Sequence, residues 1–235
     1  MKKTIILLSL CALFIGCTRE YGGVPITKNY PVSGSYTGLD VSNAFQVTVS
    51  DEVTDVVVTV GELAHDRVIV KVINGELQIG FKPNTRYNGK ATAVIPANAN
   101  LSDLDLSGAS SFVGELNSHD VDINLSGAST FRGSVDADEI DLDLSGASNA
   151  FINGRCQNEM EIDLSGASTL KAANLNAQSV SGHMSGASFA DVTVCTLLNV
   201  ELSGASTLIY GTISDDCHPN VNCPSSGSSM VRPRR

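Results

Sequence analysis

The feature that most restricts the fold of this chain is the tetrapeptide SGAS, which occurs six times. Its first serine is Ser107, Ser126, Ser145, Ser165, Ser185 and Ser203 in turn, so the spacings are 19, 19, 20, 20 and 18 residues. A period near 20 residues is typical of solenoids, in which each unit packs on its neighbours. The repeat therefore predicts a stacked architecture over residues 101–213 of the 235-residue chain.

Side-chain polarity alternates with a period of two residues before each copy. The residue directly before SGAS is apolar in every unit, and the residue before that is polar in every unit. Such alternation indicates β-strands with one buried face. Gly182 and His183 break the apolar and acidic columns in the fifth unit, where we expect weaker packing and an exposed His183.

The fold that satisfies this pattern is an all-β, right-handed parallel β-helix with about 18–20 residues per coil. Equivalent residues of successive coils then stack at about 4.8 Å, the spacing of strands in a sheet. We expect SGAS to form the corner between two sheets. Gly108 and its equivalents would allow positive φ there, and the alanines would stack where larger side chains are crowded.

Residues 36–100 precede the repeat and carry strand signals without one. FQVTVS, DVVVTV, RVIVKVI and ELQIGF are rich in β-branched residues or alternate in polarity. Asn74-Gly75 joins the last two, which predicts an antiparallel hairpin because both residues tolerate positive φ. We expect this part to be a non-repeating cap, so that 36–213 forms a single β-helical domain.

The N-terminus has the pattern of a secretory signal. Two lysines precede the apolar run 5–15, which is followed by Gly16 and Cys17. FIGC is similar to the lipobox of bacterial lipoproteins, which implies a signal peptide at 1–16 and lipid attachment at Cys17; the alternative is an ordinary signal peptide with an incidental cysteine. Residues 17–35 are rich in Gly, Pro and Ser and predict a tether.

The segment 214–235 follows the last SGAS unit, and we expect it to form a cysteine loop and a disordered tail. Cys217 and Cys223 bracket the loop and are candidates for a disulfide in an oxidising compartment. Cys156 and Cys195 fall in one apolar column two coils apart, too far for a disulfide, and we expect both to be buried thiols.

The repeated L-S-G-A-S units, together with NGELQI and AVIPANANL before them, resemble the head-GIN-domain family of putative autotransporter adhesins, common as predicted lipoproteins in Bacteroidetes-type bacteria. The resemblance covers about residues 37–213. It implies a β-helical protein of the cell envelope and an adhesion role, and it brings no catalytic or binding residues to this chain.

The charge of the chain and its motifs argue against several classes of function. The net charge of −10 and the absence of a basic face argue against nucleic-acid binding. Acidic columns that include Asp143 and Asp163 could bind a divalent cation, or serve a polysaccharide hydrolase or lyase as paired carboxylates. A solvated, charged outer face explains them more simply, and we expect no catalytic residue, metal or cofactor.

We therefore expect a non-enzymatic, lipid-anchored protein with an adhesion or scaffolding role. Its predicted location is the outer membrane, facing the periplasm or the cell surface, with contact to the membrane through the anchor. Envelope or host glycans or proteins are the expected partners. The alternative is the polysaccharide-acting enzyme that uses the acidic face. Long insertions beside clustered carboxylates would favour the enzyme, and the 101–213 coils have none.

Overall fold

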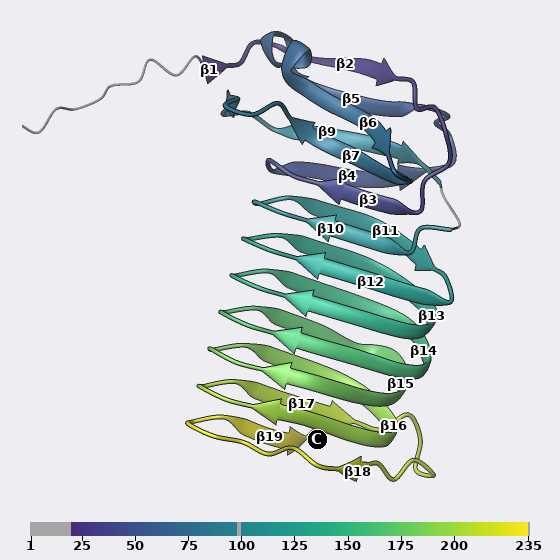
Figure 1. The fold of residues 1–235 in the computed structure, drawn as a ribbon, viewed down its shortest axis with the longest axis vertical. Coiled ribbons are helices and arrows are strands. Elements are labelled where there is room, and N and C mark those ends of the chain that lie inside the picture. Colours follow the sequence, from purple (N-terminus) through teal and green to yellow (C-terminus); the bar gives the residue numbers. More distant parts are fainter. Residues whose placement is uncertain (1–19, 98–99, 235) are drawn as a thin grey trace, which may run out of the picture.

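The computed structural model describes residues 20–97 and 100–234. The strands stack into an elongated β-solenoid, with the N-terminal strands at one end and the C-terminal residues at the other (Figure 1). The prediction of an all-β solenoid is confirmed. Among the described residues, no helix has the length and apolar character needed to cross a membrane.

The SGAS units form the middle of the stack, where every strand pairs parallel to its neighbours. Residues before each corner belong to one sheet, here called the first sheet, and residues after it belong to the second sheet. From β13 to β16 a single bent strand supplies both sheets. The strands are β10 (Asp103–Leu106), β11 (Ser111–Asn117), β12 (Asp120–Leu125), β13 (Thr130–Leu144), β14 (Asn149–Leu164), β15 (Thr169–Met184), β16 (Phe189–Leu202) and β17 (Thr207–Gly211).

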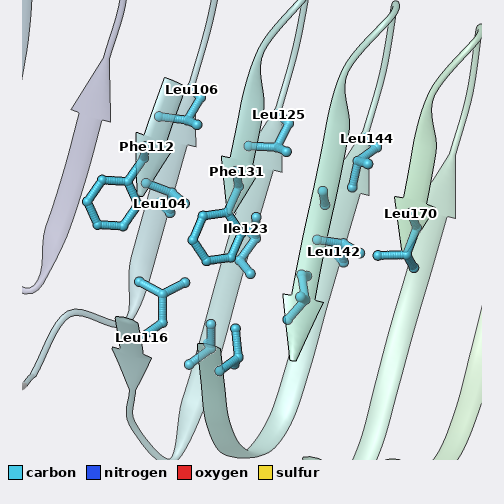
Figure 2. Packing of buried hydrophobic residues seen from close by; sticks show 14 of the residues in the cluster. Leu104, Leu106, Phe112, Leu116, Ile123, Leu125, Phe131, Leu142, Leu144 and Leu170 are labelled. Carbon is cyan, nitrogen blue, oxygen red and sulfur yellow. The ribbon is translucent and has the colours of Figure 1, made fainter. Parts of the chain in front are cut away.

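The core lies between the two sheets and follows the predicted apolar columns. Leu104 stacks on Ile123 in the first sheet, and Phe112 stacks on Phe131 in the second, all of them buried (Figure 2). The two phenylalanine rings are parallel, with centroids 5.9 Å apart. Each coil covers the apolar side chains of the next, so burial between neighbours stabilises the stack.

The SGAS corners depend on their glycines. The six corner glycines have φ between 72° and 74°, a region that costs other L-residues energy. A Cβ on Gly146 would also lie 2.6 Å from the carbonyl oxygen of Gly127 in the preceding coil. The expectation that the alanines occupy the crowded position was wrong: Ala147 is exposed, whereas the glycine before it has no space for a Cβ.

The second serine of each corner points inward and is buried. The Ser129 hydroxyl donates a hydrogen bond to the Ser126 carbonyl at 2.6 Å, and Ser148 donates to Ser145 at 2.9 Å. These bonds close the turn within one coil. The hydroxyls of Ser168 and Ser188 are buried without such a partner.

Residues 36–100 do not repeat in sequence, yet four of the seven strands described there continue the solenoid. The strands β3 and β4 stack in parallel on β10 and β11, and β7 and β9 stack on β3 and β4. The β6–β7 hairpin turns at Asn74 and Gly75, both with positive φ, which confirms the predicted hairpin. The bounds are β3 (Gly38–Val41), β4 (Phe45–Ser50), β6 (Val68–Ile73), β7 (Glu76–Phe81) and β9 (Ala91–Pro96).

The predicted tether at 17–35 was wrong for its described part. The strand β2 (Pro25–Tyr30) pairs antiparallel with β5 (Val56–Gly61), whose other edge pairs with β9. The edge of β5 would be unpaired without β2, so backbone hydrogen bonding overrides the Gly- and Pro-rich composition. The short strand β1 (Glu20–Tyr21) pairs with β8 (Arg86–Tyr87), and the 3₁₀-helix η1 (Glu62–Arg67) follows β5.

The predicted disordered tail was also wrong, because 214–234 extend the stack. The strands β18 (Asn220–Val221) and β19 (Met230–Pro233) pair in parallel with β16 and β17. Between them Gly227 has φ of 71°, and the Ser229 hydroxyl donates to the Ser226 carbonyl. The segment SGSS at 226–229 thus forms the same corner as SGAS, with serine in place of the exposed alanine.

Candidate functional site

The outer face of the first sheet carries columns of acidic residues, as the alternation predicted. Asp143 and Asp163 are direct neighbours in register, as are Asp141 and Glu161. Both columns extend beyond the repeat into β3 and β7, where Asp40 and Glu76 lie. We call this surface the acidic face; its carboxylates are Asp40, Glu76, Asp103, Asp105, Asp122, Asp141, Asp143, Glu161, Asp163 and Glu201.

Crowding changes the acidity of several of these groups. Partial burial, then the negative charges of Glu76 and Asp105, raise the pKa of Asp40 above its ordinary value. Burial raises the pKa of Asp143 too, with Asp163 and Asp141 adding to the effect. The carboxylates therefore repel one another, and the face costs the folded protein electrostatic energy at neutral pH.

Three carboxylates at one end of the acidic face lie close enough together to share a cation. Carboxylate oxygens of Glu76, Asp103 and Asp105 lie within 4.8 Å of one another. Gly38 stacks between Glu76 and Asp103 and places no side chain there. These oxygens are of the type that Ca²⁺ prefers, and a cluster of acidic groups alone does not establish an ion site.

The fifth coil interrupts the acidic face with a histidine. His183 is exposed, as predicted; its Nδ1 lies 3.2 Å from Asp163 Oδ1, and its Nε2 lies 3.8 Å from Glu201 Oε2. A shallow hollow beside it is lined by Asp143, Asp163 and His183, together with corner serines. The hollow is formed by the sheet itself, without loops that would enclose a substrate.

The outer face of the second sheet has a different character, and its basic column was not predicted from the sequence. One of its columns contains Arg132, Phe151 and Lys171 on adjacent strands. Arg132 Cζ lies 3.7 Å from the centroid of the Phe151 ring, and Lys171 Nζ lies 5.5 Å from it. The basic residues are 39 positions apart in the chain, and only the stacking of coils brings both to one ring.

The next column of the same face is uncharged and mostly polar. The structure aligns Gln46 with Ser111, Ser111 with Thr130 and Thr169 with Phe189. We call the two columns together the hydroxyl–cation face. Since the two sheets share one core, this face and the acidic face point away from each other; its members are Gln46, Thr48, Ser111, Val113, Thr130, Arg132, Asn149, Phe151, Thr169, Lys171, Phe189, Asp191, Thr207, Ile209, Met230 and Arg232.

A third candidate is the cleft where residues 36–100 meet the first SGAS unit. Its lining includes Val49, Ile95, Leu101 and Val113, with acidic side chains at Asp51 and Glu115. The cleft lies where the ends of β4 and β9 meet β11. Nothing else in the described part of the chain indicates what binds in it.

The predicted disulfide between Cys217 and Cys223 was wrong. Cys217 is bonded instead to Cys195, with Cα atoms 4.7 Å apart, and Cys223 is a half-buried free thiol. The segment between Cys217 and Cys223 contains the extended strand β18, which separates the two thiols, whereas the last coil lies directly beside β16. The candidate lipid-attachment residue Cys17 lies outside the described residues.

The expectation of two buried thiols holds for Cys156 alone. Burial raises the pKa of Cys156 to about 11. Cys156 aligns with Ala177, and Ala177 aligns with Val194, so Cys195 is one residue outside the core column. Irregular register between β15 and β16 causes this shift, which spacing in the sequence cannot reveal.

Several solved structures have a fold similar to that of this chain. No curated protein matches the chain. Among solved structures, a putative adhesin from Bacteroides fragilis aligns with a TM-score of 0.78 at 15% identity, covering 92% of this chain and all of that one (100%). A putative lipid binding protein from Parabacteroides distasonis aligns with a TM-score of 0.70 at 17% identity, covering 92% and 99%.

A putative adhesin from Parabacteroides distasonis is also similar, with a TM-score of 0.64 at 19% identity over 91% of this chain and 99% of that one. These likenesses show a shared fold. The family model described as "Putative auto-transporter adhesin, head GIN domain" matches residues 35–212, more than half of the sequence. The chain therefore belongs to the head GIN domain family.

Proposed function

We propose that this protein is a non-enzymatic, lipid-anchored binding protein of the cell envelope, with an adhesin-like role. One observation carries the proposal: the stacked coils present two extended outer faces, one with carboxylates that recur in register and one that combines hydroxyl and basic side chains. Such faces suit the binding of an extended partner more than catalysis at one point.

The family supports the proposal, since its description names adhesins. Two of the structures described above are called putative adhesins, and the third is called a putative lipid binding protein. We infer that Cys17 carries the lipid, which would place the solenoid on the outer membrane, facing the periplasm or the surface. The hollow beside Asp143 and Asp163 is formed by strand and corner residues without enclosing loops, which favours binding over a polysaccharide-acting enzyme.

The lipid anchor is testable in cells. We expect the native chain in the membrane fraction and Cys17→Ser in the soluble fraction, because the substitution removes the thiol that would be acylated. Cys11→Ser is a matched control, since it alters the leader and keeps Cys17. Membrane association of Cys17→Ser equal to that of the control would contradict the anchor.

The binding role is testable with residues 18–235, which contain every contact described above. We expect retention of at least one class of envelope polymer or protein from a panel of glycans and envelope extracts, with and without Ca²⁺. Absence of binding to the whole panel, or turnover of a bound glycan, would contradict the proposed function.

A further inference from the structure

We propose that the hydroxyl–cation face binds a linear polysaccharide that carries carboxylate groups, laid along the solenoid axis. This inference rests on the proposed binding function and names its partner class. The two outer faces differ in the charge of their side chains. In a chain with a net charge of −10, the second sheet displays basic groups where the first displays acids.

The charge of this face is positive because its one acidic residue is neutralised within the protein. Asp191 Oδ1 accepts hydrogen bonds from Arg234 Nε at 3.0 Å and from Arg234 Nη2 at 2.5 Å. Gly211 leaves the space that the Arg234 guanidinium occupies. Arg132, Lys171 and Arg232 share the column with Asp191, and none has an ion pair with a carboxylate in the described part of the chain.

The Phe151 ring holds two of these cations in place without satisfying their hydrogen bonds. A ring face attracts a cation at these distances but accepts no conventional N–H bond. Arg132 and Lys171 are both exposed, so their N–H groups face solvent. A guanidinium held by an aromatic ring and free to donate is suited to carboxylate recognition.

The neighbouring column carries hydroxyl groups that can hydrogen-bond to the hydroxyls of a sugar chain. Ser111, Thr130 and Thr169 are half-buried, and their hydroxyls can donate and accept hydrogen bonds. Arg132 and Lys171 are two strands apart, about 9.6 Å at the usual strand spacing of about 4.8 Å. A linear polymer that lies along the columns would therefore meet hydroxyls at Ser111, Thr130, Thr169 and Thr207, the amide of Asn149 between them, and cations at wider intervals.

Other polyanions fit this face less well. A nucleic acid carries a phosphate charge at every nucleotide, and binding it requires many basic contacts, while this chain is acidic overall. An anionic membrane attracts clusters of lysine and arginine, whereas Arg132, Lys171 and Arg232 lie singly on the separate strands β13, β15 and β19. Sparse carboxylates on a hydroxylated polymer match the sparse cations and the hydroxyl column.

The experiment titrates residues 18–235 with polygalacturonate by calorimetry, with dextran as the neutral polymer. We expect binding of polygalacturonate that weakens with salt, and none of dextran. Arg132→Ala with Lys171→Ala should weaken binding at least about tenfold, the effect of losing about 1.4 kcal/mol. Phe151→Leu should weaken it less, since the cations remain but lose their support.

Two matched variants test whether a change in net charge alone weakens polygalacturonate binding. Lys71→Ala with Lys90→Ala removes the same number of exposed cations elsewhere, and Asp143→Asn with Asp163→Asn alters the opposite face. Both should bind within about twofold of the native chain, and thermal unfolding should confirm that every variant folds. Equal weakening by Lys71→Ala with Lys90→Ala would overturn the assignment to this face.

Failure of this inference differs from failure of the proposed function. The inference is overturned if polygalacturonate does not bind, or binds equally well when Arg132 and Lys171 are replaced. Binding to phosphatidylglycerol vesicles alone would overturn it in favour of a membrane surface. If a different ligand from the panel of glycans and envelope extracts binds, the proposed binding function is supported although this inference is wrong. If nothing in that panel binds, the inference and the proposed function are both contradicted.

Discussion

At the scale of single residues, the glycine and the second serine of each SGAS corner have different structural roles. Glycine is required because its backbone approaches the previous coil at positive φ. The second serine is required for a different reason, since its hydroxyl satisfies the carbonyl three residues earlier in most coils. The exposed alanine has neither role, which explains why the last corner tolerates Ser228 in its place.

Replacing the buried serines one at a time should show the difference between a paired and an unpaired hydroxyl. Ser129→Ala should lower the free energy of unfolding by about 1 kcal/mol, because it leaves the Ser126 carbonyl without its donor. Ser168→Ala should be neutral or stabilising, since its hydroxyl is buried without a partner. Urea denaturation measures both, and equal losses would contradict this view of the corner.

At the scale of elements, the two ends of the stack depend on pairing across long sequence separations. The N-terminal strand β2 covers β5, and the last coil is fastened to β16 by the Cys195–Cys217 disulfide and by Arg234. Both end segments have compositions typical of loops. They are ordered because an adjacent strand edge offers backbone partners.

Mapping disulfides in the native protein should distinguish the two pairings. Non-reducing digestion should yield a peptide that links Cys195 to Cys217, and alkylation before denaturation should label Cys223 ahead of the buried Cys156. Cys217→Ser should lower stability by roughly 2–4 kcal/mol, the usual effect of losing a disulfide. A linked Cys217–Cys223 peptide with a free Cys195 would contradict the pairing.

At the scale of the whole molecule, the acidic face makes stability depend on pH. Asp40, Asp105 and Asp143 each have a pKa raised first by burial and then by neighbouring carboxylates. The folded chain therefore binds protons at these sites more readily than the unfolded chain does. Its stability should rise as the pH falls from 7 through the raised pKa values toward the ordinary value of 3.8.

Thermal unfolding between pH 7 and pH 4.5 measures this effect, and we expect the midpoint to increase on acidification. Asp105→Asn with Asp143→Asn should raise the midpoint at pH 7 and flatten its pH dependence, because it removes two repelling charges. Asp51→Asn with Asp55→Asn is a control outside the acidic columns. A midpoint that falls steadily on acidification would contradict the account.

Much of this architecture could be predicted from the sequence, because neighbouring units of a solenoid obey one local rule. The period of SGAS and the alternation around Leu104 and Phe112 determined the parallel stack, the core columns and the acidic face, since side-chain direction in a strand depends only on position. The Asn74-Gly75 turn was determined in the same local way.

The tertiary structure alone decided the features that depend on which distant segments lie side by side. Strand-edge pairing ordered the two ends, and the irregular register between β15 and β16 moved Cys195 out of the core toward Cys217. The same stacking placed Arg132 and Lys171 beside one phenylalanine ring. These contacts join residues of different coils, whose alignment depends on bulges and edges that no local pattern records.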